Sequence, residues 1–290
     1  MTVAKNLKKT TRLVARATGQ SYVQALRLHT AQGFPIVCAP TPLQEELEGA
    51  VLSKIGDLFP STTDGSNHLF DLGKVAPTSN SLILGPVASA LLPGLAVNLM
   101  PVLESPKESA ELHGIPGLRV RPHPLGLSLF RHDLDAEIII RGTTATEWEL
   151  GHQSGLVEHH RLGTCLAARY PETWMRLEMD RYMNGLPEDP VWQSVLLRRI
   201  GLIAELSPRS VSSYWSHGQG VVVEVQQPRS DAAVVEQFIR DFTSPRLSPE
   251  VVYVPEEDYP CRGGMSRSVQ FGTPRSLHPL TIRFVHLPQF

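Results

Sequence analysis

The chain has 290 residues, of which 41% are hydrophobic and 19% are charged, and it contains 24 prolines and 22 glycines. These values exclude a disordered chain and allow one large globular domain or two ordinary ones with many turns. The formal net charge is -2, yet residues 1–44 contain no acid and six basic residues, so residues 45–290 carry -8. A basic segment joined to an acidic body is typical of proteins that meet phosphate.

The spacing of the cysteines and the length of the apolar runs exclude further classes of protein. Cys38, Cys165 and Cys261 are widely spaced and form no CxxC pair, which predicts reduced thiols and no structural metal. The most apolar stretch, residues 82–103, is broken by three prolines and is not the uninterrupted run of roughly 18 residues that a membrane span needs. Because the N-terminus also lacks the apolar core of a secretory signal, we expect a cytoplasmic protein without a membrane partner.

Residues 1–33 predict a basic helical arm. Gly19 is placed to end a first helix, and Ser21 can cap a second helix that ends at Gly33. The basic residues of the first helix recur at helical spacing and form one stripe: Lys5, Lys8, Lys9, Arg12 and Arg16. We expect this stripe to bind nucleic acid through phosphate, and the alternative is a solvated outer face of a helix that packs on the body.

Residues 34–115 predict an α/β segment, which is either a separate domain or part of the main body. The expected elements are a strand at 34–38, a helix at 43–58, a strand at 82–84 and an apolar, proline-bent helix at 87–103.

Residues 116–290 predict an α+β domain in which Gly126 belongs to the turn of a first hairpin. In chain order we expect strands at 118–122, 127–131 and 136–141, helices at 164–184 and 191–206, a strand at 221–225, a helix at 232–242, and strands at 251–254, 269–271 and 280–287. No internal repeat is evident. The predicted fold class is α+β, with an N-terminal basic helical hairpin followed by a mixed, mainly antiparallel sheet body with packed helices.

One constellation of residues points to chemistry. Arg141 ends a strand of three consecutive isoleucines and is followed by Gly142, a pair suited to a phosphate that must approach the backbone closely. Further along the chain, a serine-rich segment with two aromatic residues precedes the strand at 221–225, and Glu250 precedes the strand at 251–254. The serine-rich segment contains Ser212, Ser213, Tyr214 and Trp215.

This order resembles the arginine, serine, glutamate class of ADP-ribosyltransferase-like folds, over about residues 136–256. The resemblance implies a toxin-type or modification enzyme that uses NAD. It assigns pyrophosphate binding to Arg141 with Gly142, bracing of the site to Ser212 or Ser213, stacking on nicotinamide to Tyr214 or Trp215, and stabilisation of the ribose cation to Glu250. This chain departs from the family at Ser248, where the family usually has Glu or Gln.

The alternative function is that of a non-enzymatic, DNA-associated accessory protein. Residues 5–32 resemble the leader segments of bacterial plasmid and mobile-element proteins. The two hypotheses differ in a spatial requirement. An enzyme needs Arg141, Ser212 or Ser213, and Glu250 to meet in one cleft, whereas an accessory protein needs only a continuous basic face.

Overall fold

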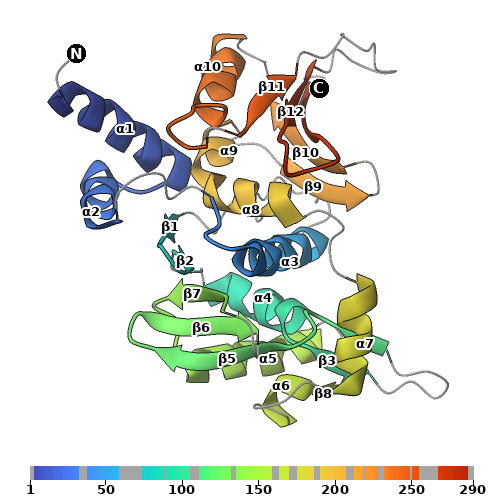
Figure 1. The fold of residues 1–290 in the computed structure, drawn as a ribbon. Coiled ribbons are helices and arrows are strands. Elements are labelled where there is room, and N and C mark those ends of the chain that lie inside the picture. The colour runs from blue at the N-terminus through green and yellow to red at the C-terminus, as the bar shows by residue number, and fades with distance from the viewer. Residues whose placement is uncertain are drawn as a thin grey trace.

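The computed structural model describes residues 3–32, 38–58, 74–85, 87, 89–104, 111–131, 135–158, 163–169, 175–185, 190–206, 212–217, 220–227, 232–248, 250–254 and 267–286. Over these residues the protein is α+β. Two five-stranded sheets lie on either side of a layer of helices, and a helical hairpin projects from one end (Figure 1).

The arm is the predicted helical hairpin. Helix α1 (Val3–Thr18) ends at Gly19, which has a φ of 68°, and α2 (Tyr22–Gln32) follows. Ser21 and Gln24 form a reciprocal cap at the start of α2, because Gln24 N–H donates to Ser21 Oγ while Ser21 N–H donates to Gln24 Oε1. The predicted end of α2 at Gly33 lies outside the described residues, as does most of the strand expected at 34–38.

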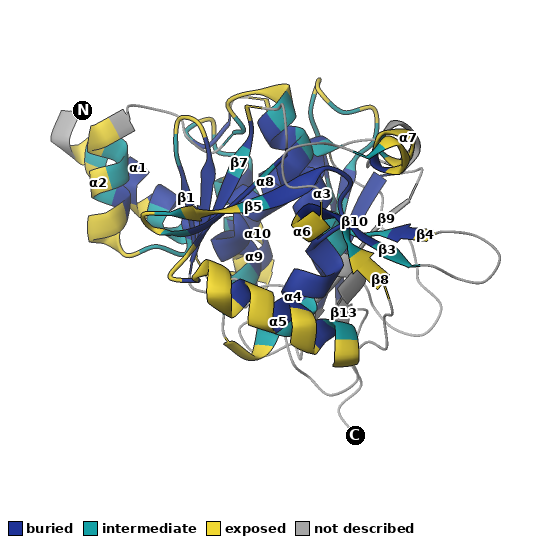
Figure 2. Ribbon diagram, turned by 90° about the horizontal axis from the view of Figure 1, so that it is seen from below, coloured by how far each residue is buried: buried dark blue, intermediate teal, exposed yellow. Residues whose placement is uncertain are grey.

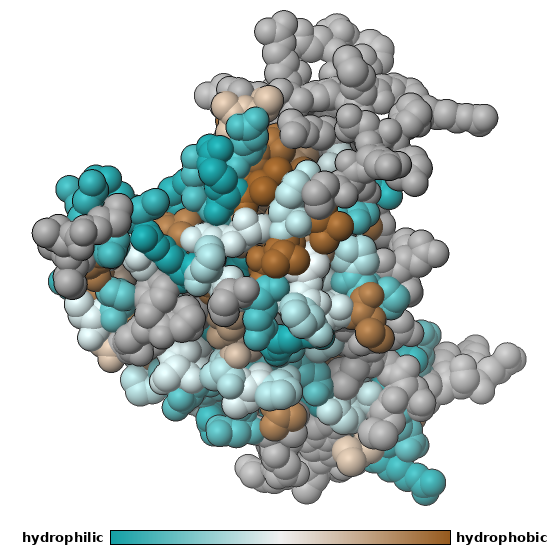
Figure 3. Space-filling model, turned by 45° about the horizontal axis from the view of Figure 1, so that its top comes forward, coloured by the Kyte–Doolittle hydropathy of each residue, from teal (hydrophilic) through white to brown (hydrophobic). Residues whose placement is uncertain are grey.

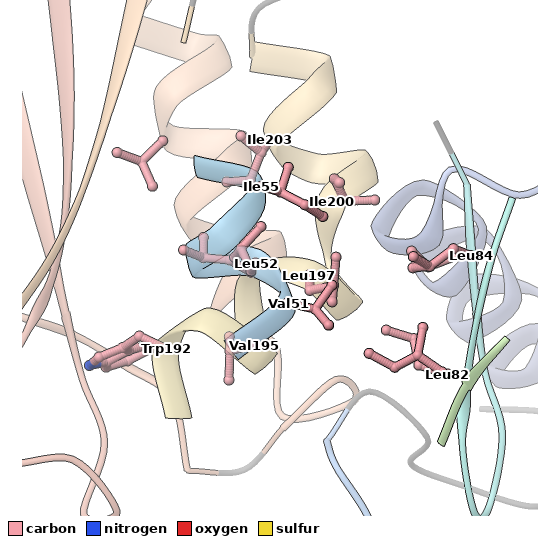
Figure 4. Close-up of a cluster of buried hydrophobic side chains, with 14 of the residues drawn as sticks. Val51, Leu52, Ile55, Leu82, Leu84, Trp192, Val195, Leu197, Ile200 and Ile203 are labelled. Atoms are coloured by element: carbon pink, nitrogen blue, oxygen red, sulfur yellow. The ribbon is translucent and has the colours of Figure 1, made fainter. Parts of the chain in front are cut away.

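The central layer consists of α3 (Pro42–Leu58), α8 (Pro190–Arg198) and α9 (Ile200–Leu206). Figure 4 shows the hydrophobic cluster that joins this layer to the first sheet. It contains Val51, Leu52 and Ile55 of α3, Leu82 and Leu84 of the sheet, Trp192, Val195 and Leu197 of α8, and Ile200 and Ile203 of α9. Figure 2 shows α3 and α8 as mainly buried, so these helices lie inside the molecule.

The first sheet has the strand order β1-β2-β7-β6-β5. Its strands are β1 (Val75–Pro77), β2 (Leu82–Leu84), β5 (Leu118–His123), β6 (Gly126–Arg131) and β7 (Glu137–Arg141). Neighbouring strands are antiparallel except β2 and β7, which pair in parallel. The predicted division near residue 115 therefore falls between strands of a single sheet, and residues 74–84 belong to the main body.

The second sheet has the strand order β9-β10-β13-β12-β11. Its strands are β9 (Ser212–His217), β10 (Gly220–Gln227), β11 (Val252–Val254), β12 (Arg267–Gly272) and β13 (Leu280–His286). Here β10 and β13 are the parallel pair, and the other neighbours are antiparallel.

The two sheets share one topology, which the sequence did not reveal. Each begins with an antiparallel strand pair, crosses over through a helix, and ends with a three-stranded meander whose last strand returns parallel to the second. The crossover helices are α4 (Leu92–Leu99) and α10 (Ala232–Phe242). A helix that begins with proline precedes each sheet, and these two helices, α3 and α8, pack closely at Gly49 and Pro190. The structure therefore repeats a strand order although the sequence shows no evident repeat.

Two predicted helices are shorter than expected, since their ends belong to a small third sheet. The helix expected at 87–103 is α4, preceded by a 3-10 turn at Ser89–Leu91, and Pro101 is followed by β3 (Val102–Glu104). Strand β3 pairs with β4 (Glu111–His113) and β8 (Gly163–Cys165). The helix expected at 164–184 is therefore divided into β8, α6 (Leu166–Arg169) and α7 (Arg176–Gly185).

Helix α5 (Ala145–Glu158) covers α4 on the outside of the molecule. Gly151 and Gly155 face α4 at close range, because a Cβ atom on Gly155 would lie 2.4 Å from the carbonyl oxygen of Pro93. The opposite face of α5 is exposed in Figure 2. The glycine pair therefore sets the distance between these two helices.

Candidate functional site

Helix α1 presents four cations on one exposed face. Lys5, Lys8, Lys9 and Arg12 recur at i, i+3, i+4 and i+7, which places them within one arc of the helix, and all four are exposed. Within the described part of the chain, none of the four forms an ion pair with an acidic side chain. Figure 3 shows hydrophilic residues over the arm, at the left of the view.

Arg16 continues the same stripe but is already paired. Its guanidinium binds Glu205 of α9, with Nη2 2.5 Å from Oε2, and also binds Asp241 of α10. The hydrogen bond to Glu205 is the largest of the effects that raise the pKa of Arg16 above its ordinary value. Arg16 therefore anchors the end of α1 to the body, so we remove it from the predicted phosphate-binding set, which leaves Lys5, Lys8, Lys9 and Arg12.

The face of α1 opposite the cations is covered by protein. Leu13, Val14 and Ala17 are buried in the main hydrophobic core, and α1 crosses α9 so closely that a Cβ on Gly201 would lie 2.1 Å from Arg16 O. An interfacial membrane helix needs a free apolar face, and the described side chains of α1 do not form one. Among the described helices, none combines the length and apolar character of a membrane span.

A groove of about 460 Å³ lies where the end of α1 meets α9 and α10. Leu202 and Phe238 contribute to an apolar lining, and the charged lining residues Arg16 and Glu205 are paired with each other. On this side of the molecule hydrophobic residues form separate patches among hydrophilic ones (Figure 3). Among the lining residues that the structure describes, Arg16 is the one cation, and it is already paired with Glu205 and Asp241.

Arg141 and Gly142 lie where the sequence placed them, at the end of β7 and before α5. Both residues are exposed, and Gly142 has a φ of 77° with open space around it. The N-terminus of α5 already holds a carboxylate of its own, however. Thr144 N–H donates to Glu147 Oε2 at 2.7 Å, and Glu147 N–H donates to Thr144 Oγ1, so a capping box occupies this end of the helix. The hydrogen bonds from Thr144 also lower the pKa of Glu147.

The other predicted NAD residues lie in or next to opposite edge strands of the second sheet. Ser212, Ser213, Tyr214 and Trp215 form most of the edge strand β9, and Glu250 stands two residues before the other edge strand, β11. Four strand spacings of about 4.8 Å separate these edges by roughly 19 Å. Glu250 Oε2 is 3.8 Å from Arg275 Nε, and Arg275 also binds Glu45 of α3. The strand order thus does not bring the arginine, serine and glutamate positions together.

We compared the chain with models of protein families, with curated proteins and with solved structures. None of them matches this protein. Among the described residues, no group of three or more histidine, cysteine, aspartate or glutamate side chains is placed to hold a metal ion. The assignment of a site therefore depends on the geometry of this chain alone.

Two features near the arm could not be found from the sequence. Glu205 and Asp241 are 189 and 225 residues away from Arg16 in the sequence. A local sequence pattern therefore cannot predict that these two acids bind Arg16. Arg199 is fully buried at the turn between α8 and α9, although the sequence predicted one helix through this position, at 191–206.

Proposed function

We propose that the protein is a DNA-associated accessory protein that binds the phosphate backbone through α1. The observation that carries this proposal is the exposed face formed by Lys5, Lys8, Lys9 and Arg12, together with the absence of an acidic partner for these four cations in the described part of the chain. Lys5 also lies in the first turn of α1, which contains no acid, and a cation at this positive end of the helix costs stability unless an anion is bound.

The chemistry of the arm favours a duplex over a single strand. Proteins that bind single strands without sequence preference stack bases on aromatic side chains between their cations, and no aromatic residue lies in α1. Tyr22, at the start of α2, is the first aromatic residue of the chain. A row of cations alone recognises phosphate charge and carries no information about base sequence.

The proposal fixes the expected salt dependence. Each duplex phosphate that is neutralised contributes about -0.9 to the slope of log K against log salt concentration, so four contacts predict a slope of about -3.6. We would measure binding of the full chain to a fluorescent duplex by anisotropy at several salt concentrations. Single-stranded DNA of equal length and duplex RNA serve as competing ligands.

A triple variant tests the location of the site. The substitutions Lys8→Gln, Lys9→Gln and Arg12→Gln remove three cations and should reduce the slope to about -0.9. The matched control removes three exposed arginines outside the arm, Arg176, Arg181 and Arg240, and should leave the slope unchanged. Equal binding by the two variants, or no binding by the unaltered protein, contradicts the proposal.

The ADP-ribosyltransferase hypothesis makes a different prediction for the same protein. It requires NAD binding through Arg141 and release of nicotinamide that depends on Glu250, because a carboxylate stabilises the developing ribose cation. Calorimetry with NAD and a nicotinamide-release assay on the unaltered protein and on Glu250→Gln separate the two functions. Turnover that Glu250→Gln abolishes would favour the enzyme, whereas no binding of NAD would favour the accessory protein.

A further inference from the structure

Helix α2 presents an outer face that the described part of the protein does not cover. Tyr22 and Val23 are 40% and 55% exposed, and Arg27 lies one turn after Val23 on the same side of the helix and is also exposed. Within the described residues, Arg27 forms no ion pair with an acidic side chain. Figure 2 shows exposed residues along α2 at the edge of the molecule. This face therefore offers an apolar side chain and a forked cation to a partner.

The inner side of α2 is fixed to the body. Ala25 is 0% exposed in the main hydrophobic core, and Gln20, in the turn before the helix, donates from Nε2 to the carbonyl oxygen of Val75 at 2.5 Å. The turn between α1 and α2 consists of residues 19–21, and Gly19 gives it a φ of 68°. A helix that is held in this way presents its outer side chains in a defined geometry, as a recognition surface requires.

The charge of the two helices favours duplex DNA as the partner. Neither α1 nor α2 contains an aspartate or a glutamate, so neither helix has a carboxylate to repel the phosphates on the two edges of a DNA groove. Two helices joined by a short turn that contains glycine form an arrangement found in DNA-binding proteins, in which the second helix enters the major groove while the first crosses the backbone. The major groove is about 12 Å wide and admits an α-helix.

We propose that α2 enters the major groove of a DNA duplex and reads base pairs through Arg27 and Val23, while the cations of α1 hold adjacent phosphates. This inference rests on the function proposed above and adds sequence recognition to it. An arginine binds O6 and N7 of guanine with its forked guanidinium, and an apolar side chain contacts the methyl group of thymine. Positions i and i+4 of a helix lie about 6 Å apart along its axis, and base pairs are stacked roughly 3.4 Å apart. The preferred duplex should therefore contain a guanine and a thymine about two base pairs apart.

The test begins with the selection of duplexes from a random library by the full chain, followed by sequencing. Anisotropy with the selected duplex and with a scrambled duplex of the same composition, at one salt concentration, then gives a specificity ratio. The selected duplex should bind at least about tenfold more tightly, since one good base contact discriminates by about 5- to 150-fold. Equal, salt-dependent binding of both duplexes overturns this inference and leaves phosphate binding by α1 intact. No binding of any duplex contradicts both proposals.

Single substitutions separate the reading of bases from the binding of phosphate. Arg27→Gln should remove the guanine preference and lower the specificity ratio by about 5- to 150-fold, and Val23→Ala should relax the thymine preference alone. The matched control on α1, Lys9→Gln, should weaken binding to both duplexes equally and preserve the ratio. All three positions are exposed on helices, so circular dichroism should show an unchanged fold. If Arg27→Gln leaves the ratio unchanged, Arg27 does not read a base and the inference fails.

Discussion

Glu48 of α3 and Arg198 of α8 form a fully buried ion pair in the helical layer between the two five-stranded sheets. Arg198 Nε is 2.7 Å from Glu48 Oε2 and Nη2 is 2.6 Å from Oε1, and both side chains are 0% exposed. Ser194 Oγ and Gln44 Nε2 donate further hydrogen bonds to the same carboxylate. Gln44 in turn bonds both backbone groups of Glu137, the first residue of β7, so the network joins α8, α3 and the first sheet.

Glu48→Gln should destabilise the protein by about 3–5 kcal/mol, because it removes the charged carboxylate that pairs with the buried Arg198 guanidinium. Chemical denaturation measures this loss. The control is Glu236→Gln, which breaks an exposed pair with Arg240 at 3.6 Å and should cost less than about 0.5 kcal/mol. A second variant, Glu48→Leu with Arg198→Met, removes both charges and should recover most of the stability. A cost for Glu48→Gln as small as that of the control would contradict this account.

A second buried ion pair, Arg119 with Glu178, predicts that the folded protein loses stability in acid. Burial acts to raise the pKa of Glu178, but hydrogen bonds from Arg119 and from the N–H groups of Met175 and Gly117 outweigh it, so the pKa is lowered. A carboxyl group whose pKa is lower in the folded state contributes stability above its unfolded pKa of about 4.3, and this contribution is lost as the pH falls through the folded pKa. Denaturation of the unaltered protein and Glu178→Gln between pH 7 and 3 should therefore show a weaker pH dependence below about pH 4.3 in the variant.

His152 predicts a loss of stability in a different pH window. Its side chain is buried and its Nε2 has no hydrogen-bond partner among the described residues. Burial lowers its pKa, with Glu149 partly opposing this change. The unfolded chain therefore takes up the proton first, so stability falls as the pH drops below the unfolded value of about 6.5.

His152→Gln should flatten the stability curve between about pH 6.5 and 5, since glutamine does not titrate. Chemical denaturation at half-unit pH intervals measures the slope. His123→Gln, at the less buried end of β5, is the control and should retain the slope of the unaltered protein. A slope that is the same in all three proteins would show that His152 is not the titrating group.

Much of the fold was predictable because the hydrophobic pattern of several segments is long enough to indicate a helix or a strand without tertiary contacts. The helix expected at 232–242 is α10 without change, and the hairpin expected at 118–131 also forms, although Gly126 pairs with His123 as the first residue of β6 and does not belong to the turn. Strand β9 was not predicted, since its serine-rich sequence is typical of turns and only pairing with β10 makes it a strand. Residues 164–165 likewise leave their predicted helix because β8 pairs with β3. In both places a tertiary contact overrides local preference.

In the candidate site, too, the features set by local spacing were predictable and those set by tertiary contacts were not. The cationic stripe of α1 follows from spacing alone, and its exposure agrees with that spacing. The pairing of Arg16 depends on residues that only the fold brings near. The enzyme hypothesis relied on the order of Arg141, Ser212 and Glu250 along the chain, which does not determine where their strands lie in a sheet. The shared topology of the two sheets could not be predicted from the sequence either. It is a repeat of strand order, and strand order in a sheet does not follow from the order of strands along the chain.

The contact between α4 and α5 predicts that a Gly→Ala substitution in α5 lowers the stability of the protein, which is the opposite of its usual effect in a helix. Gly→Ala within a helix ordinarily stabilises by up to about 1 kcal/mol. At Gly155 the new Cβ would lie 2.4 Å from Pro93 O and 2.9 Å from Val97 Cβ, so the helices must move apart. We therefore expect Gly155→Ala to destabilise the protein by about 1–3 kcal/mol, the usual range for overpacking. Ser154→Ala, at the exposed neighbouring position, controls for helix propensity and should change stability by less than about 0.5 kcal/mol in chemical denaturation. A stabilising Gly155→Ala would mean that α5 does not pack on α4 at this distance.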